Sequence, residues 1–149
     1  MNNRHASGLK LTALGLVGFH FLTVVLHSVA HEVLNVKASP AQLAFIIPVI
    51  ILGPVAAGFT LLKFEKAGAA VLLVSMLGSL AFGVYYHFVA DTIDHVAHVA
   101  RLRPEFWSSM FRVTSYLLAA SEAAGAAVAG ALLAAGRQPL KHYATRTDF

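Results

Sequence analysis

The most restrictive feature of this sequence is a set of long apolar stretches. Three of them contain no Asp, Glu, Lys or Arg and a fourth is interrupted only by Glu122; they cover residues 11–31, 38–62, 67–90 and 113–136. An α-helix needs about 20 apolar residues to cross roughly 30 Å of hydrocarbon. No segment alternates polar and apolar residues over the roughly ten positions that a membrane β-strand requires. The sequence therefore predicts four transmembrane helices.

Short connections between these stretches predict a single all-α integral membrane domain, residues 1–149, folded as an up-down-up-down four-helix bundle. The expected spans are approximately 10–35, 40–62, 67–98 and 106–135. Basic residues are more frequent in cytoplasmic loops. One side of the bundle would carry seven of them (Arg4, Lys10, Lys63, Lys66, Arg137, Lys141 and Arg146) and the other four (Lys37, Arg101, Arg103 and Arg112). We therefore expect both termini in the cytoplasm.

The first apolar stretch also has a competing interpretation. Arg4 and Lys10 precede an apolar run that ends in Ser28-Val29-Ala30, which is the pattern of a cleavable secretory signal. The run is long for a signal and includes two histidines, so a transmembrane helix is the preferred interpretation. The alanine- and glycine-rich composition is compatible with a bacterial inner membrane.

Composition excludes several classes of function. The chain has no cysteine, which rules out disulfides, zinc–thiolate sites, iron–sulfur clusters and cysteine nucleophiles. Its formal net charge is +4, but the basic residues stand singly at the ends of apolar runs. Nucleic-acid binding requires a basic patch on one face. We therefore expect the lipid bilayer, and no nucleic acid, as a partner.

Histidines in the first and third spans carry the chemical information. His20, His27 and His31 are separated by seven and four residues, which places them on one helix face. In the third span, a helix through residue 98 would align four residues at offsets of 0, 4, 7 and 11: His87, Asp91, Asp94 and His98. His31 and His87 each follow a lysine (Lys10 and Lys66) by 21 residues, so the two stripes should meet at one height.

Imidazoles and carboxylates converging inside a membrane bundle are a ligand set for a divalent transition metal such as zinc, copper or iron. The predicted ligands are His27, His31, His87, Asp91 and Glu122. Further residues would orient the ligand rings or receive ions near the outer surface: His20, Glu32, Asp94, His95 and His98. The site would face the periplasm or exterior. With no cysteine, a soft copper(I) route is disfavoured.

Three functions remain open from the sequence. The first is metal handling or metal-dependent redox chemistry; whether the protein is an enzyme is not decided. The second is a haem b electron-transfer subunit with His31 and His87 as axial ligands. The third is a non-catalytic accessory subunit of a larger complex, or a homo-oligomer, packed through the Ala/Gly-rich fourth span. The HSVAH segment (27–31) resembles the first histidine box of membrane desaturases, but their HxxHH boxes are absent, so no family is assigned.

Overall fold

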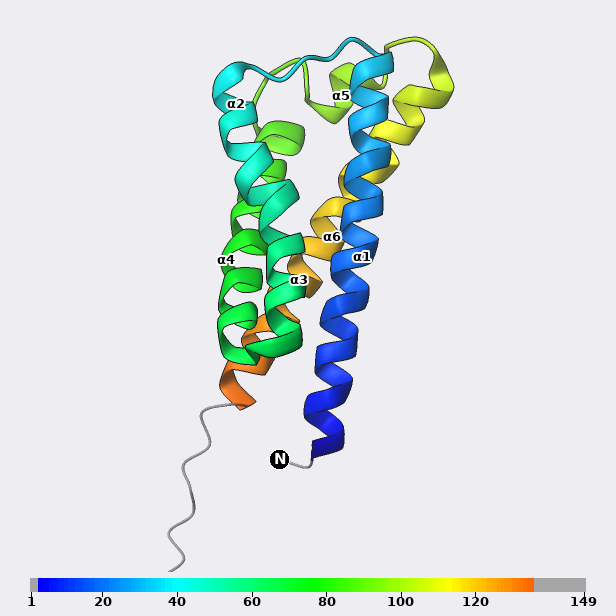
Figure 1. Ribbon diagram of the computed structural model, residues 1–149. Coiled ribbons are helices and arrows are strands. Elements are labelled where there is room, and N and C mark those ends of the chain that lie inside the picture. The colour runs from blue at the N-terminus through cyan, green and yellow to red at the C-terminus, as the bar shows by residue number, and fades with distance from the viewer. Residues whose placement is uncertain (1–2, 136–149) are drawn as a thin grey trace, which may run out of the picture.

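The computed structural model describes residues 3–135, and within that range the chain forms helices and no strands. Four long helical segments run in alternating directions (Figure 1). Each is long and apolar enough to cross a membrane, as the sequence predicts. Arg137, Lys141 and Arg146, which contributed to the predicted orientation, lie outside the described residues. The elements in chain order are α1 (Asn3–Val33), α2 (Pro40–Phe45), η1 (Ile46–Leu52), α3 (Gly53–Lys63), α4 (Glu65–Val84), η2 (Tyr85–Val89), α5 (Val96–Val99) and α6 (Glu105–Ala135).

The second long segment changes its winding halfway along. It begins with a capping box, in which Ser39 and Gln42 each satisfy the other's backbone N–H, and Pro40 occupies the first turn. Between Phe45 and Gly53 the chain forms the wider π-helix η1, and α3 then starts with Pro54 in its first turn. Pro54 has no N–H to donate to the carbonyl of Ile50, four residues earlier. That carbonyl is therefore available to another part of the molecule.

The third long segment ends earlier than its sequence pattern predicts. The helix stops at Val89, after the π-helix η2, because Ala90 adopts an extended conformation. We expected it to continue to residue 98. Asp and Thr side chains compete with the helix for backbone hydrogen bonds, and the Thr92 hydroxyl donates to the carbonyl of Tyr86 near the helix end. The expected stripe over 87–98 therefore becomes a turn followed by the short helix α5.

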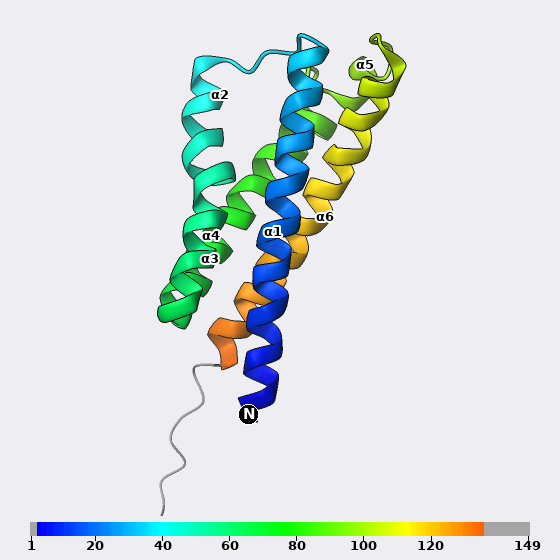
Figure 2. The ribbon, with the colours of Figure 1, turned by 45° about the vertical axis from the view of Figure 1, so that its right-hand side comes forward.

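Small residues hold the helices together at the end of the bundle near the N-terminus. A Cβ on Gly68 would lie 2.4 Å from the backbone nitrogen of Leu61, and one on Gly125 would lie 3.0 Å from Met76. At Gly68 only glycine permits such close approach, and at Gly125 any larger residue would require Met76 to shift. At the other end, α2 stands away from α1 (Figure 2). The bundle is therefore tightly packed at one end and more open at the other, where the histidines lie.

Candidate metal centre

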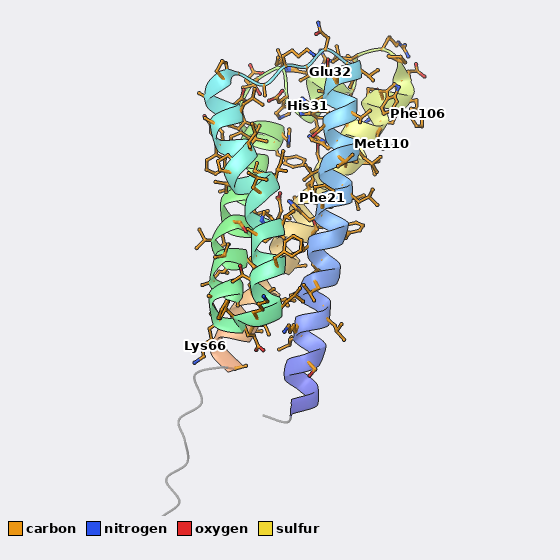
Figure 3. The ribbon with its side chains drawn as sticks, in the orientation of Figure 1. Phe21, His31, Glu32, Lys66, Phe106 and Met110 are labelled. Carbon is orange, nitrogen blue, oxygen red and sulfur yellow. The ribbon has the colours of Figure 1, made fainter. Side chains whose placement is uncertain are left out.

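Three histidines from two helical segments meet near the open end of the bundle. His27 and His31 come from α1 and His87 from η2. The ring centroid of His27 lies 4.8 Å from that of His31 and 4.9 Å from that of His87, and one ligand nitrogen from each of the three lies within 4.8 Å of the others. Figure 3 shows His31 and Glu32 near the end of α1 that is opposite to Lys66. The predicted meeting of the two helices' histidines is confirmed for His27, His31 and His87.

Hydrogen bonds fix which nitrogen each ring presents. The Nδ1 atoms of His31 and His87 lie 2.8 Å and 3.1 Å from the carbonyl oxygens of Val36 and Asp94, and a carbonyl can only accept. Both rings therefore carry their proton on Nδ1 and keep a lone pair on Nε2. A metal-binding histidine shows this arrangement, with its other nitrogen donating to the protein.

His27 has the same orientation through a side chain of α6. Its Nδ1 lies 2.8 Å from Oγ1 of Thr114, whose own hydroxyl donates to the carbonyls of Met110 and Phe111. The hydroxyl oxygen therefore accepts from His27 Nδ1–H. The Nε2 atom of His27 is buried with no hydrogen-bond partner. All three Nε2 lone pairs are thus free to bind an ion.

Phe111 supports the three rings from α6. Its side chain is fully buried, and its ring centroid lies 4.5, 4.8 and 5.3 Å from those of His27, His31 and His87. Sequence analysis missed both Phe111 and Thr114. Phe111, Thr114, Leu118 and Glu122 follow one another at intervals of three or four residues, which marks one face of the fourth span. That pattern does not indicate contact with histidine.

The carboxylates of the third segment separate because the helix ends. Asp94 is buried; its backbone carbonyl accepts from His87, its Oδ2 accepts from Gln42 at 3.3 Å, and its Oδ1 has no partner. Asp91, a predicted ligand, is instead turned outward: its side chain is 92% exposed and pairs with His98 at 3.3 Å. An offset of four residues aligns two side chains only while the helix continues. The structure therefore does not bring Asp91 to the three histidines.

The remaining predicted residues of the outer surface take structural positions. His95 accepts a hydrogen bond from the backbone of Ala97 and caps α5, and His98 lies beside it with ring centroids 5.6 Å apart. Glu32 is exposed and forms an ion pair with Lys37 at 2.5 Å. None of these side chains belongs to the group that meets at His27.

His20 and Glu122 form a second buried polar group, deeper in the bundle. Nε2 of His20 lies 3.1 Å from the carbonyl of Ile50, the same carbonyl that Pro54 leaves without its helical donor. Nε2 therefore donates, and the Nδ1 lone pair faces a carboxyl oxygen of Glu122 at 3.9 Å. Both side chains are almost fully buried. Glu122 is not among the residues that could share one ion with His27.

A cavity of about 330 Å³ connects these two polar groups. The three histidines, Asp94, Ser79 and Glu122 line it, as do the Glu32–Lys37 ion pair and apolar side chains of α1, η1, α4 and α6. A Cβ placed on Gly83 would lie 4.0 Å from His87 and 3.8 Å from Glu122. The histidine cluster and Glu122 therefore face the same space.

The haem interpretation finds no support in this geometry. The rings of His31 and His87, the expected axial pair, have centroids 6.2 Å apart. A porphyrin held by these two rings would lie in the plane midway between them. The centroid of the His27 ring is 4.8 Å from one and 4.9 Å from the other, so His27 occupies part of that plane. Three convergent imidazoles fit a single ion instead.

Comparisons with protein-family models, with curated proteins and with solved structures find no match for this chain. What the histidine cluster does is therefore inferred from its own chemistry. Three neutral imidazoles can bind a transition metal and leave a fourth position for water or another small ligand.

Proposed function

We propose that this chain is an integral membrane protein that binds one transition metal ion through Nε2 of His27, His31 and His87. One observation carries the proposal: each of the three rings donates its Nδ1–H to an oxygen of the protein. Three such rings from two helical segments meet within reach of one ion. A cluster that served only to join helices would use its second nitrogens as well, on one another or on the opposing helix. Here the three inner nitrogens are left for a ligand.

The donor set favours zinc, copper(II) or iron(II). Imidazole suits all three metals, and no thiolate is present to select copper(I). Ligand nitrogens around tetrahedral zinc lie roughly 3.4 Å apart, so a bound ion would draw the rings together by about an ångström from their present spread. The carboxylate of Asp94 on the cavity wall would balance part of the charge of the ion.

We propose a role in metal handling or metal-dependent redox chemistry at the outer side of a bacterial inner membrane. Lys66 lies at the end of the bundle opposite His31 (Figure 3). Lys63 ends α3 at the same turn, and Lys10 donates to the carbonyl of Leu62 beside it. The excess of such residues favours the cytoplasm for that end. The metal would then face the periplasm or exterior. An open coordination position beside a cavity favours a metal that exchanges small ligands over a metal with a purely structural role.

Metal analysis of the purified protein tests the proposal. Wild-type protein in detergent, loaded with zinc and passed over a desalting column, should retain one equivalent. His27→Asn, His31→Asn and His87→Asn should each lower the affinity by about tenfold or more. His98→Asn, which removes a histidine outside the cluster, should retain the wild-type stoichiometry. If the His27→Asn and His98→Asn proteins hold equal metal, the proposed centre is wrong.

We also propose that α6 packs against another helix, of a second copy or of a partner subunit. Its outward face carries small residues at helical spacing: Ala120, Ala123, Ala124, Ala127 and Ala131. Small residues allow close helix contact in a membrane. Self-association measured in detergent and lipid, described below, distinguishes these partners.

A further inference from the structure

The cavity beside the histidines has the character of a site for an organic ligand. Its volume of about 330 Å³ falls in the range of ligand pockets and is about twice that of an engineered cavity that admits benzene. One wall is formed by isoleucines of η1 (Ile46, Ile47, Ile50 and Ile51). The histidine cluster, Ser79 and Glu122 line the same space, with Glu122 near His87 across Gly83. A molecule that fills this space needs an apolar body and few polar atoms.

The exposed rim of the cavity is partly apolar and partly formed by the Glu32–Lys37 ion pair. Ser28 of α1 and Leu43 and Ile47 of the second segment line the cavity and are exposed, the latter two by 43% and 49%. All three belong to helices that are apolar enough to lie in a membrane. An apolar molecule dissolved in the bilayer would reach the cavity there without crossing the tightly packed end of the bundle.

Both π-helices adjoin the cavity, η1 through its isoleucines and η2 through His87. A π-helical turn is less stable than an α-helical turn and is found mostly at functional sites. In η1 the wider turn precedes Pro54, which cannot donate a hydrogen bond to the carbonyl of Ile50. That carbonyl accepts a hydrogen bond from His20 instead. The irregular winding thus places both the cavity wall and one metal ligand.

We propose that the cavity binds an apolar molecule carrying a hydroxyl group, an alcohol or a phenol, with the hydroxyl oxygen at the metal. The proposal rests on the proposed metal centre. The polar atoms of the cavity select this head group. The metal requires an oxygen lone pair, while the carboxyl of Glu122, near His87 across Gly83, can accept a hydrogen bond. A purely apolar molecule would leave both the metal and the carboxyl of Glu122 without this partner.

Gly83 provides the means to block this site. A Cβ there meets its neighbours at ordinary contact distance, so Gly83→Ala should fold normally, whereas the larger side chain of Gly83→Leu extends into the cavity between His87 and Glu122. Ile50→Phe narrows the cavity from η1 and serves as a second blocking variant. Gly18→Leu is the matched control, because a Cβ at that glycine of α1 meets nothing within 4 Å.

The test uses the full chain in lipid nanodiscs loaded with cobalt(II), whose visible spectrum reports its ligands. Addition of 4-propylphenol should change the spectrum of the wild-type and Gly18→Leu proteins in a saturable way, and 4-propyltoluene, which lacks the hydroxyl, should not. Gly83→Leu and Ile50→Phe should bind cobalt but require about tenfold more phenol. A wild-type spectrum that phenol leaves unchanged, or equal responses from wild-type and both blocked variants, would overturn the proposal.

A second measurement separates this proposal from the metal centre itself. If cobalt does not bind, the proposed metal centre fails, and saturation-transfer NMR on metal-free protein then tests the cavity alone. Transfer to 4-propylphenol in wild-type protein that is reduced in Gly83→Leu supports a phenol site. Equal transfer in both proteins shows partition into lipid only and removes the cavity proposal as well.

Discussion

Nδ1 of His27 and Oγ1 of Thr114 lie 2.8 Å apart although 87 residues separate them in the sequence. The Thr114 hydroxyl uses its own hydrogen on the carbonyls of α6, so its oxygen can only accept from the ring. This contact joins the first and last spans at the centre of the histidine cluster. It also determines which nitrogen of His27 faces the proposed ion.

Thr114→Val should weaken metal binding without unfolding the protein. Valine has the same shape as threonine but cannot accept the His27 hydrogen bond, and loss of such an orienting partner costs about 10- to 100-fold in metal affinity. Thr114→Ser keeps the hydroxyl and should bind within a few-fold of wild type. Competition titration with a zinc-binding dye measures the affinities. Equal affinities in the valine and serine variants would contradict the proposed role of this hydroxyl.

Phe111→Ala should be one of the most destabilising substitutions in the described chain. The ring is fully buried against all three histidines, and removing a buried phenylalanine costs about 3–5 kcal/mol. Phe106→Ala is the matched control on the same helix, because that ring is 64% exposed and its loss should change the stability by about 0.5 kcal/mol or less. Denaturant unfolding in detergent, without added metal, compares the two.

Metal binding should be lost as the pH falls. Each ligand imidazole must be neutral to bind, and the ordinary histidine pKa is about 6.5. Protons therefore compete with the ion below neutral pH, and up to three can compete for each ion because three rings bind it. Zinc at 100 times its dissociation constant stabilises the folded protein by about 2.7 kcal/mol, and this increment should shrink as the pH is lowered below about 7. Thermal unfolding with and without zinc across that range checks the effect; a zinc increment that is constant with pH would exclude imidazole ligands.

If the three histidines alone hold the ion, Glu122→Gln should leave zinc affinity within about twofold of wild type. Substitution of a residue that contacts the metal would lower the affinity far more. The amide keeps the shape of the carboxyl and can donate to the free Nδ1 of His20, so the fold should be retained. A drop in zinc affinity of about tenfold or more would instead return Glu122 to the ligand set that the sequence predicts. Zinc competition at fixed pH decides between the two outcomes.

Substitution of the outward face of α6 tests the proposed packing of that helix. Ala127 is exposed at the centre of the small-residue stripe, so Ala127→Leu should prevent close helix approach and weaken association by about 1 kcal/mol or more. Leu117→Ala, at an exposed apolar position of the same helix, should have a smaller effect. Light scattering in detergent and cross-linking in lipid report the oligomer. If wild-type protein is a monomer in both, a second copy is excluded as the partner.

Local features of the sequence determined most of the fold. Helix formation in apolar stretches depends on residues within a few turns of one another, and so does the face that a histidine occupies. The four spans and the common face of His20, His27 and His31 could therefore be predicted. The end of the third helix at Val89 could not be predicted, because the Asp and Thr residues that follow it also fit a continuous helical stripe.

Tertiary packing decided which of the candidate residues meet. The end of the helix at Val89 turns Asp91 outward and brings the backbone of Asp94 under His87. The rotation of α6 brings Phe111 and Thr114 to the same rings. Sequence periodicity fixes the angle of a side chain about its own helix axis, but not the rotation and offset of one helix relative to another. Those depend on close contacts between residues far apart in the chain, such as Gly53 with Ser75 and Gly125 with Met76.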